Sequence, residues 1–231
     1  MLQARTCRNT LILVRLIRFR YKLLLILVAH PNVGLAVAQV AFVQRFTMGT
    51  VMETDNVLSE YEVGDCSGVW DNLENQVVYG LIGQDGDRLR VVSTNIYKSP
   101  DVQHEYCVVD NTMRDGVMRD LTGVINLQSV YKKEGIYLGS DNKLEGLGIT
   151  AQGLLQGTYL LHEEREANSN AYSDKFYSKF EESEGNPFTA DASQLIAVES
   201  MNNAFIGTWI SFDSPVKLGA TWGDWRVPES A

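Results

Sequence analysis

From residue 77 to the C-terminus, apolar residues fall in short runs separated by turn residues, at intervals of about eight to twelve positions. The runs are rich in Val, Ile, Leu, Thr and Tyr, which favour extended chain. They predict strands over residues 77–82, 88–96, 104–110, 121–131, 135–140, 143–150, 153–162, 204–213 and 216–226. Because the linkers are too short for parallel crossovers, we expect a mainly β fold, an antiparallel β-barrel or β-sandwich.

The linkers between these runs contain residues that tolerate a positive φ. Asp85-Gly86, Glu134-Gly135 and Ser140-Asp141-Asn142 are the clearest examples. Short hairpin loops need such residues, so these positions predict tight turns between antiparallel strands.

The pattern changes between residues 163 and 203, where we expect one or two helices. Tyr172, Phe176 and Phe180 lie at positions i, i+4 and i+8 among polar and charged residues, which is typical of an amphipathic helix. A second helix is predicted over residues 190–203, with Thr189 or Asp191 as its N-cap. The apolar side of these helices is expected to pack on the sheet.

The N-terminus has the three-part pattern of a signal peptide. Six basic side chains precede an apolar run at residues 23–29, and Ala36-Val37-Ala38 offers the small residues that a signal peptidase requires. We expect residues 1–38 to be removed after Ala38 and the mature chain to be exported, periplasmic or extracellular. A retained membrane anchor is the alternative, because residues 23–43 are uncharged and long enough to span a bilayer.

The rest of the chain is predicted to be an acidic domain. Residues 39–62 show no sustained period and predict an N-terminal arm that is partly disordered, before a single antiparallel β domain over residues 63–231. All 29 acidic residues but only 14 of the 20 basic ones lie beyond Ala38, a formal charge of −15. Such a surface repels phosphate, so nucleic-acid binding is excluded, and membrane contact is expected only through an uncleaved leader. The oligomeric state stays open.

Cys66 and Cys107 are the two cysteines that remain after cleavage. An exported chain meets an oxidising compartment, so they predict a disulfide that closes a loop of about forty residues and stabilises the fold by about 4 kcal/mol. His104 and Cys107 also have a ligand-like spacing. Zinc needs three or four ligands, however, and the remaining histidine of this region, His162, stands alone, so we expect no metal site and no cofactor.

Glycine precedes Trp or Tyr by two positions five times, at Gly68/Trp70, Gly135/Tyr137, Gly157/Tyr159, Gly207/Trp209 and Gly223/Trp225. Random placement would give about one such pair. In a strand, glycine beside an aromatic ring allows the bend that a closing sheet needs. Gly68-Val69-Trp70 also resembles the Gly-x-Trp opening of the lipocalins. This three-residue resemblance implies an exported eight-stranded barrel that holds an apolar ligand, although the predicted helices depart from the lipocalin order.

The sequence contains no serine-hydrolase elbow, phosphate loop, dinucleotide fingerprint or zinc-protease helix. The candidate ligand-binding residues are Trp209, Phe212, Trp222 and Trp225, because flat rings stack on sugars and line apolar pockets. Alternatively, these rings fill the core. We therefore expect a non-enzymatic protein that binds a small molecule or glycan, or an envelope-associated structural protein. The alternative is a carbohydrate-active enzyme with two catalytic carboxylates, and no pair among the 29 acids stands out.

The leader generates the first prediction. Expressed with its own N-terminus in a secreting host, the protein should have an intact mass that begins at Gln39, because the peptidase recognises the small residues at 36 and 38. Mass spectrometry of the exported protein measures this directly. A membrane-bound product that retains residues 1–38 would contradict cleavage and favour the anchor.

Overall fold

The computed structural model describes residues 51–61, 64–71, 77–83, 85–139, 142, 144–164, 170–184, 186–190, 202–211, 216–224 and 227–228. Residues 51–231 form one compact unit. The predicted signal peptide and its cleavage site lie outside the described residues.

Most of the described chain is strand, with two single-turn helices before the first strand. In chain order the elements are η1 (Leu58–Tyr61), α3 (Gly68–Asp71), β1 (Val77–Ile82), β2 (Asp87–Lys98), β3 (Glu105–Arg114), β4 (Val117–Lys132), β5 (Ile149–Glu164), β6 (Asn170–Ser183), β7 (Asn186–Ala190), β8 (Asn202–Ile210) and β9 (Lys217–Asp224). Every pairing between them is antiparallel. The predicted mainly antiparallel β class is confirmed.

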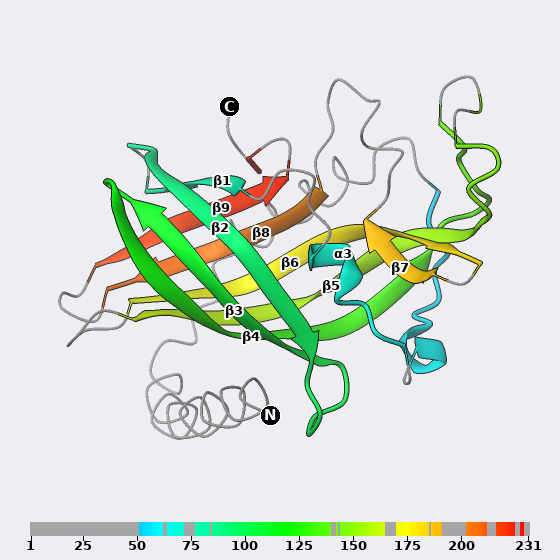
Figure 1. The fold of residues 1–231 in the computed structure, drawn as a ribbon, viewed down its shortest axis with the longest axis horizontal. Coiled ribbons are helices and arrows are strands. Elements are labelled where there is room, and N and C mark those ends of the chain that lie inside the picture. Colours follow the sequence, from blue (N-terminus) through cyan, green and yellow to red (C-terminus); the bar gives the residue numbers. More distant parts are fainter. Residues whose placement is uncertain are drawn as a thin grey trace. The chain divides into compact units, whose positions relative to one another are not determined.

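Eight of the strands close into a barrel. The hydrogen-bonded order is β5-β4-β3-β2-β1-β9-β8-β6, and β5 also pairs with β6, which completes the ring. β7 adds to the end of β6 outside the ring. Figure 1 shows the strands curving round a common interior, with α3 beside β6 and β7. Of the two architectures that the pattern allowed, the barrel is the one that forms.

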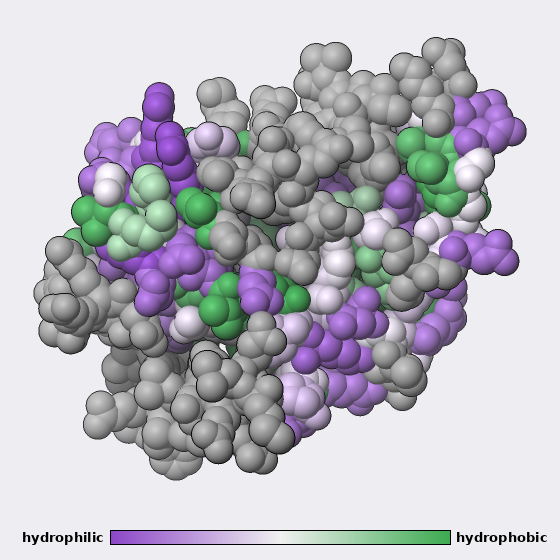
Figure 2. All heavy atoms as spheres, viewed as in Figure 1, coloured by the Kyte–Doolittle hydropathy of each residue, from purple (hydrophilic) through white to green (hydrophobic). Residues whose placement is uncertain are grey.

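Alternate residues of each strand face the barrel interior, as the pleat of a strand requires. On β3, for example, Tyr106 and Val108 belong to the buried core cluster. Aromatic rings fill much of this core: Trp222 stacks on Phe205 with ring centroids 5.1 Å apart, and Tyr159 meets both rings edge-on. On the face in Figure 2, hydrophilic residues cover much of the described surface and separate the hydrophobic ones into small clusters.

The Gly-x-Trp tripeptide lies in α3, which contacts β2, β6 and β7. Trp70 is 2% exposed, donates its indole N–H to the Ser178 hydroxyl over 2.9 Å, and packs edge-on against Tyr106 and Phe176. A side chain on Gly68 would lie 2.5 Å from the carbonyl oxygen of Phe188 in β7. Glycine therefore lets this turn approach β7 closely enough for the indole to reach the barrel interior.

The described part of the predicted N-terminal arm, residues 51–61, runs along β4. The backbone N–H groups of Glu53 and Val57 donate to carbonyls of Lys132 and Val130 over 2.8 and 2.9 Å. The Asn56 side chain bonds Gln128 and Val130 where the β4–β5 register shifts by one residue. These bonds extend the sheet along the part of β4 that lies beyond the start of β3.

The helix predicted from Tyr172, Phe176 and Phe180 is wrong, because all three lie on strand β6. A spacing of four residues is a little more than one helical turn, but it is also two repeats of the strand period, so the pattern fits both structures. The three rings do share one face, which is the barrel interior. The second predicted helix, 190–203, lies mostly outside the described residues, and its described ends belong to β7 and β8.

The strand predicted over residues 135–140 is also wrong, and of the one predicted over 143–150 only the last two residues are strand. Gly135, Gly139, Gly146 and Gly148 all have positive φ angles of 65 to 92°. Such angles are incompatible with a regular strand, so the segment between β4 and β5 forms a loop. Gly86 and Asn142 also have positive φ, as predicted for the turns there.

Two of the predicted Gly-x-aromatic pairs, those at Gly157 and Gly207, lie where neighbouring strands leave no room for a Cβ atom. A side chain on Gly157 would be 2.0 Å from the Asn126 carbonyl oxygen and 2.8 Å from the Phe176 ring. The residue opposite Gly157 is Leu127, at the register shift of β4. Glycine at this point therefore allows β4, β5 and an interior aromatic ring to share a space that admits no Cβ atom.

This close packing predicts the effect of two glycine substitutions. Gly157→Ala should lower the free energy of unfolding by about 2 kcal/mol or more, because backbone and ring must both move. Gly219→Ala in β9 is the matched control, since nothing lies within 4 Å of its added Cβ. It should change the free energy by less than about 1 kcal/mol. Urea unfolding of both variants tests the packing; equal effects would contradict it.

Candidate functional site

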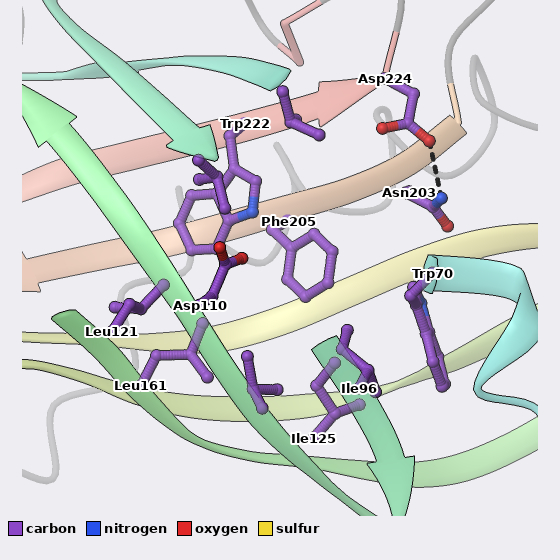
Figure 3. Close-up of a pocket in the computed structure, with 13 residues that line it drawn as sticks. Trp70, Ile96, Asp110, Leu121, Ile125, Leu161, Asn203, Phe205, Trp222 and Asp224 are labelled. Atoms are coloured by element: carbon purple, nitrogen blue, oxygen red, sulfur yellow. Dashed lines mark hydrogen bonds between the residues drawn. The ribbon is translucent and has the colours of Figure 1, made fainter. Parts of the chain in front are cut away.

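The barrel interior contains a cavity that opens among the side chains of β1, β2, β3, β4, β5, β8 and β9, next to Trp70 (Figure 3). Its volume is ≈ 40 Å³ for water-sized spheres, enough for about three water molecules. All the lining residues are buried. The apolar ones are Trp70, Val78, Val91, Ile96, Val108, Leu121, Ile125, Leu161, Phe205 and Trp222.

Three polar side chains interrupt this apolar lining: Asp110, Asn203 and Asp224. Asn203 and Asp224 form a pair, since the Asn203 amide nitrogen donates to Asp224 Oδ2 over 2.6 Å and to the Val69 carbonyl over 3.0 Å. The Oδ1 atoms of both residues are buried and have no hydrogen-bond partner in the described part of the chain. Figure 3 shows both side chains at the Trp70 end of the cavity.

A β-bulge in β8 places Asn203. Between Asn202 and Phe205 the register with β9 shifts by one residue, and Asn203 has a φ of 45°, a left-handed value that Asn tolerates. Asn202 holds the bulge, because its side chain bonds the backbone N–H and C=O of Lys179 over 2.7 and 3.0 Å. The bulge therefore turns an amide side chain into the cavity beside the last residue of β9.

Asp110 also lies at an irregular position. It is 4% exposed, on β3, opposite the bulge between Val92 and Asn95 of β2. One of its carboxylate oxygens accepts a bond from the N–H of Asn111 over 2.5 Å. In Figure 3 its carboxylate points toward Trp222. Bulges that aim side chains are common beside functional sites, and both acids of this cavity are next to one.

Burial shifts the ionisation of Asp224. Loss of solvent raises its pKa from an ordinary value of 3.8 to about 7, and the hydrogen bond from Asn203 opposes the shift only in part. Near neutral pH this carboxyl group therefore exists in both protonation states. Such a group can accept a proton, donate one, or bind a cation in place of the proton.

The structure brings only part of the predicted aromatic cluster to the cavity. Trp222 lines it, whereas Trp209 lies outside its lining, below the Arg114 guanidinium at 4.6 Å from the ring centre. Phe212 and Trp225 lie outside the described residues. Trp222 both lines the cavity and packs in the core against Phe205, so the two interpretations of this residue are not exclusive.

A second buried polar cluster lies near the turn that joins β3 to β4. Glu163 is fully buried and accepts hydrogen bonds from the Thr112 hydroxyl, the Tyr172 hydroxyl and the Asn170 amide, over 2.5, 2.9 and 3.1 Å. Its acceptors are thus satisfied by groups from β3 and β6. This cluster ties three strands together, which indicates a structural role.

The predicted disulfide is wrong, because Cys66 has a free thiol. Cys66 belongs to the barrel core, where its N–H donates to the Tyr106 hydroxyl over 3.1 Å. Cys107 follows Tyr106 on β3, and consecutive strand residues face opposite sides of the sheet. Cys107 is buried outside that core. Burial raises the pKa of the Cys66 thiol to about 11, so it stays protonated at neutral pH.

The alternation of inward-facing and outward-facing residues along the strands could have located the two aspartates of the cavity from the sequence. Asp110 is two positions from Val108, and Asp224 is two positions from Trp222, so each aspartate continues the inward face of an apolar strand. A polar residue in such a series is expected to be buried. The aromatic pattern that indicated Trp209, Phe212, Trp222 and Trp225 does not include these polar residues.

Comparisons with protein-family models, with curated proteins and with solved structures found no match. Among the described residues, no group of three His, Cys, Asp or Glu side chains is arranged to hold a metal ion. Neither helix of the described chain has the length and apolar character needed to cross a bilayer.

The raised pKa of Asp224 predicts how stability depends on pH. Below about pH 4 the carboxyl group is protonated in both the folded and the unfolded state. As the pH rises from there to about 7, only the unfolded chain releases its proton, so the free energy of unfolding falls. The loss is about 4 kcal/mol at most and is complete above the folded pKa.

Asp224→Asn should remove this loss while retaining an acceptor for Asn203. Relative to the wild type, the variant should gain stability between pH 4 and about pH 7 and show no further gain above that, as measured by urea unfolding at several pH values. The control is Asp115→Asn in the exposed β3–β4 turn, where a φ of 53° also suits Asn. A stability difference for Asp224→Asn that stays constant across this range would show that its pKa is ordinary.

Proposed function

We propose that this protein is an exported, non-enzymatic β-barrel that binds a small, mainly apolar molecule in its interior. The observation that carries the proposal is the cavity between Trp222, Phe205 and the aliphatic side chains of β1–β5. Most small-molecule sites combine such an apolar lining with a few polar groups that orient the ligand. Eight-stranded barrels have an interior just wide enough to hold one small ligand.

The polar groups support a binding role over a purely structural one. A buried polar atom without a hydrogen-bond partner costs about 1–3 kcal/mol, and both Asn203 and Asp224 have one at the cavity. Bulges in β2 and β8 accompany these side chains, although regular strands would pack more simply. A ligand that bonds the two free oxygens would offset that cost.

The leader supports export, with the mature chain in the periplasm or outside the cell. Its basic, apolar and small-residue parts follow the order of a signal peptide. The free Cys66 thiol does not oppose this location, since a protonated thiol buried in a core is protected from oxidation. The acidic mature chain would keep the barrel away from anionic membrane surfaces.

A second candidate is an enzyme that uses the two carboxylates. Asp110 and Asp224 line one cavity, and the pKa of Asp224 near 7 suits a general acid. The cavity volume opposes glycoside cleavage, because a sugar ring with its hydroxyl groups is larger than three water molecules. A hydrolase screen with Asp110→Asn and Asp224→Asn tests this candidate. Activity lost in a folded variant would favour the enzyme.

Filling the cavity should abolish ligand binding. Val108 lines the cavity from β3, and Val108→Phe would place a ring in the empty space. The expected result is that quenching or enhancement of tryptophan fluorescence by small apolar ligands disappears, while the far-ultraviolet circular dichroism is unchanged. Trp222 and Trp70 both line the cavity and serve as reporters.

The matched control is Val109→Phe, one residue along the same strand on a partly exposed face. It should leave binding unchanged. If Val108→Phe fails to fold, Val91→Ile makes a smaller change to the same lining. Equal ligand response in the wild type and in a folded filling variant would exclude the cavity as the site, and no response to any ligand would leave a structural role.

A further inference from the structure

We propose that the cavity selects a short-chain primary amine, with the ammonium group at the Asn203–Asp224 end and the hydrocarbon part against Trp222 and Phe205. The inference rests on the proposed binding function and names the ligand class. It depends on which atoms the cavity leaves without partners, on the charge of its lining, and on its size.

The two lining atoms that have no hydrogen-bond partner within the described chain are both oxygens. Asp224 Oδ1 and Asn203 Oδ1 are buried in side chains that are 7% and 4% exposed, and both side chains line the cavity (Figure 3). The Asn203 amide nitrogen already donates twice. This end of the cavity therefore offers hydrogen-bond acceptors, and a ligand there has to supply the donors. An ammonium group has three N–H donors and no acceptor, which matches that need.

The charge of the lining favours a cation. Asp110 and Asp224 are its two ionisable side chains among the described residues, and no described basic residue lines the cavity. A protonated amine would supply the missing counter-charge and relieve the unfavourable burial of Asp224. The stacked rings of Trp222 and Phe205 also present aromatic surface, which attracts cations.

The size of the cavity limits the ligand to a few heavy atoms. A volume of ≈ 40 Å³ holds about three water molecules. The ammonium group takes the place of one water at the polar end, and the remaining space adjoins apolar side chains. Propylamine fits this description, and propan-1-ol has the same shape and size without the charge, so the two form a matched pair of probes.

The proton on Asp224 competes with the ammonium group. The groups that line the cavity with Asp224 are Asn203, which bonds it, and Asp110, the other titratable side chain of the described lining. Below pH 7 Asp224 is increasingly neutral, and its attraction for a cation is lost. Alkylamines stay protonated up to about pH 10. Amine binding should therefore strengthen between pH 5.5 and 8.5, and alcohol binding should not.

The experiment is an NMR titration of the ¹⁵N-labelled mature protein with propylamine and with propan-1-ol, at both pH values. At pH 8.5 propylamine should bind about tenfold more tightly than propan-1-ol, as expected for a charged hydrogen bond. At pH 5.5 the amine affinity should fall about tenfold or more. Asp224→Asn should lower the amine affinity about tenfold at pH 8.5 and leave that of the alcohol within about twofold. Asp115→Asn should change neither.

The outcomes separate the two proposals. Equal affinity for amine and alcohol, or amine binding that Asp224→Asn leaves unchanged, would overturn the amine selectivity and leave the apolar binding function standing. Binding of propan-1-ol without binding of propylamine would also overturn the amine selectivity and leave the apolar binding function standing. If neither probe shifts the resonances of residues that line the cavity, the binding function itself fails. Should Asp224→Asn not fold, Asp110→Asn replaces the other carboxyl group of the lining and should also reduce amine affinity.

Discussion

The pairing of β1 with β9 is the constraint on which the rest of this structure depends. Four residue pairs, from Tyr79 with Gly223 to Ile82 with Ala220, join the first and last strands of the sheet. Without them both strands would present unpaired N–H and C=O groups at open edges. Their pairing closes eight strands into a ring, and the number of strands in a closed ring sets the width of its interior. Whether a side chain is buried then follows from its face on the strand.

Closure also explains why the interior is mainly filled and yet leaves a cavity. Rings of Tyr159, Phe205 and Trp222 occupy one side of the barrel, while smaller Val and Ile side chains of β1–β4 face them. The glycines at 157 and 207 let strands and rings approach more closely than any Cβ would allow. The space left is small, and the polar residues at its edge make it chemically distinct from a packing defect. Packing defects are usually lined by apolar groups alone.

Much of the fold was predictable from the local pattern. The predicted strand 77–82 coincides with β1, and six others overlap β2, β3, β4, β5, β8 and β9, because alternating or continuous apolar runs between turn residues are typical of strands. The error at Tyr172, Phe176 and Phe180 arose because a spacing of four satisfies both the helical and the strand period. The loop over residues 135–148 was misassigned because its apolar residues resemble a strand, while four of its glycines have positive φ.

The candidate site was less predictable. Trp222 was named from its aromatic character, but Asp110, Asn203 and Asp224 were not singled out among the many polar residues of an acidic chain. The predicted disulfide between Cys66 and Cys107 was wrong because the spacing of two cysteines in the sequence does not show that Cys66 lies in the barrel core and Cys107 outside it.

The sequence by itself determined the antiparallel β class and the acidic character of the chain after its basic leader. These properties depend on local patterns, composition and the conformational preferences of single residues. Only the tertiary structure decided that the sheet closes, that β6 is a strand, and that two aspartates and an asparagine share one cavity. Those outcomes depend on the cross-strand register and its bulges, because a shift of one residue exchanges the inward and outward faces of a strand.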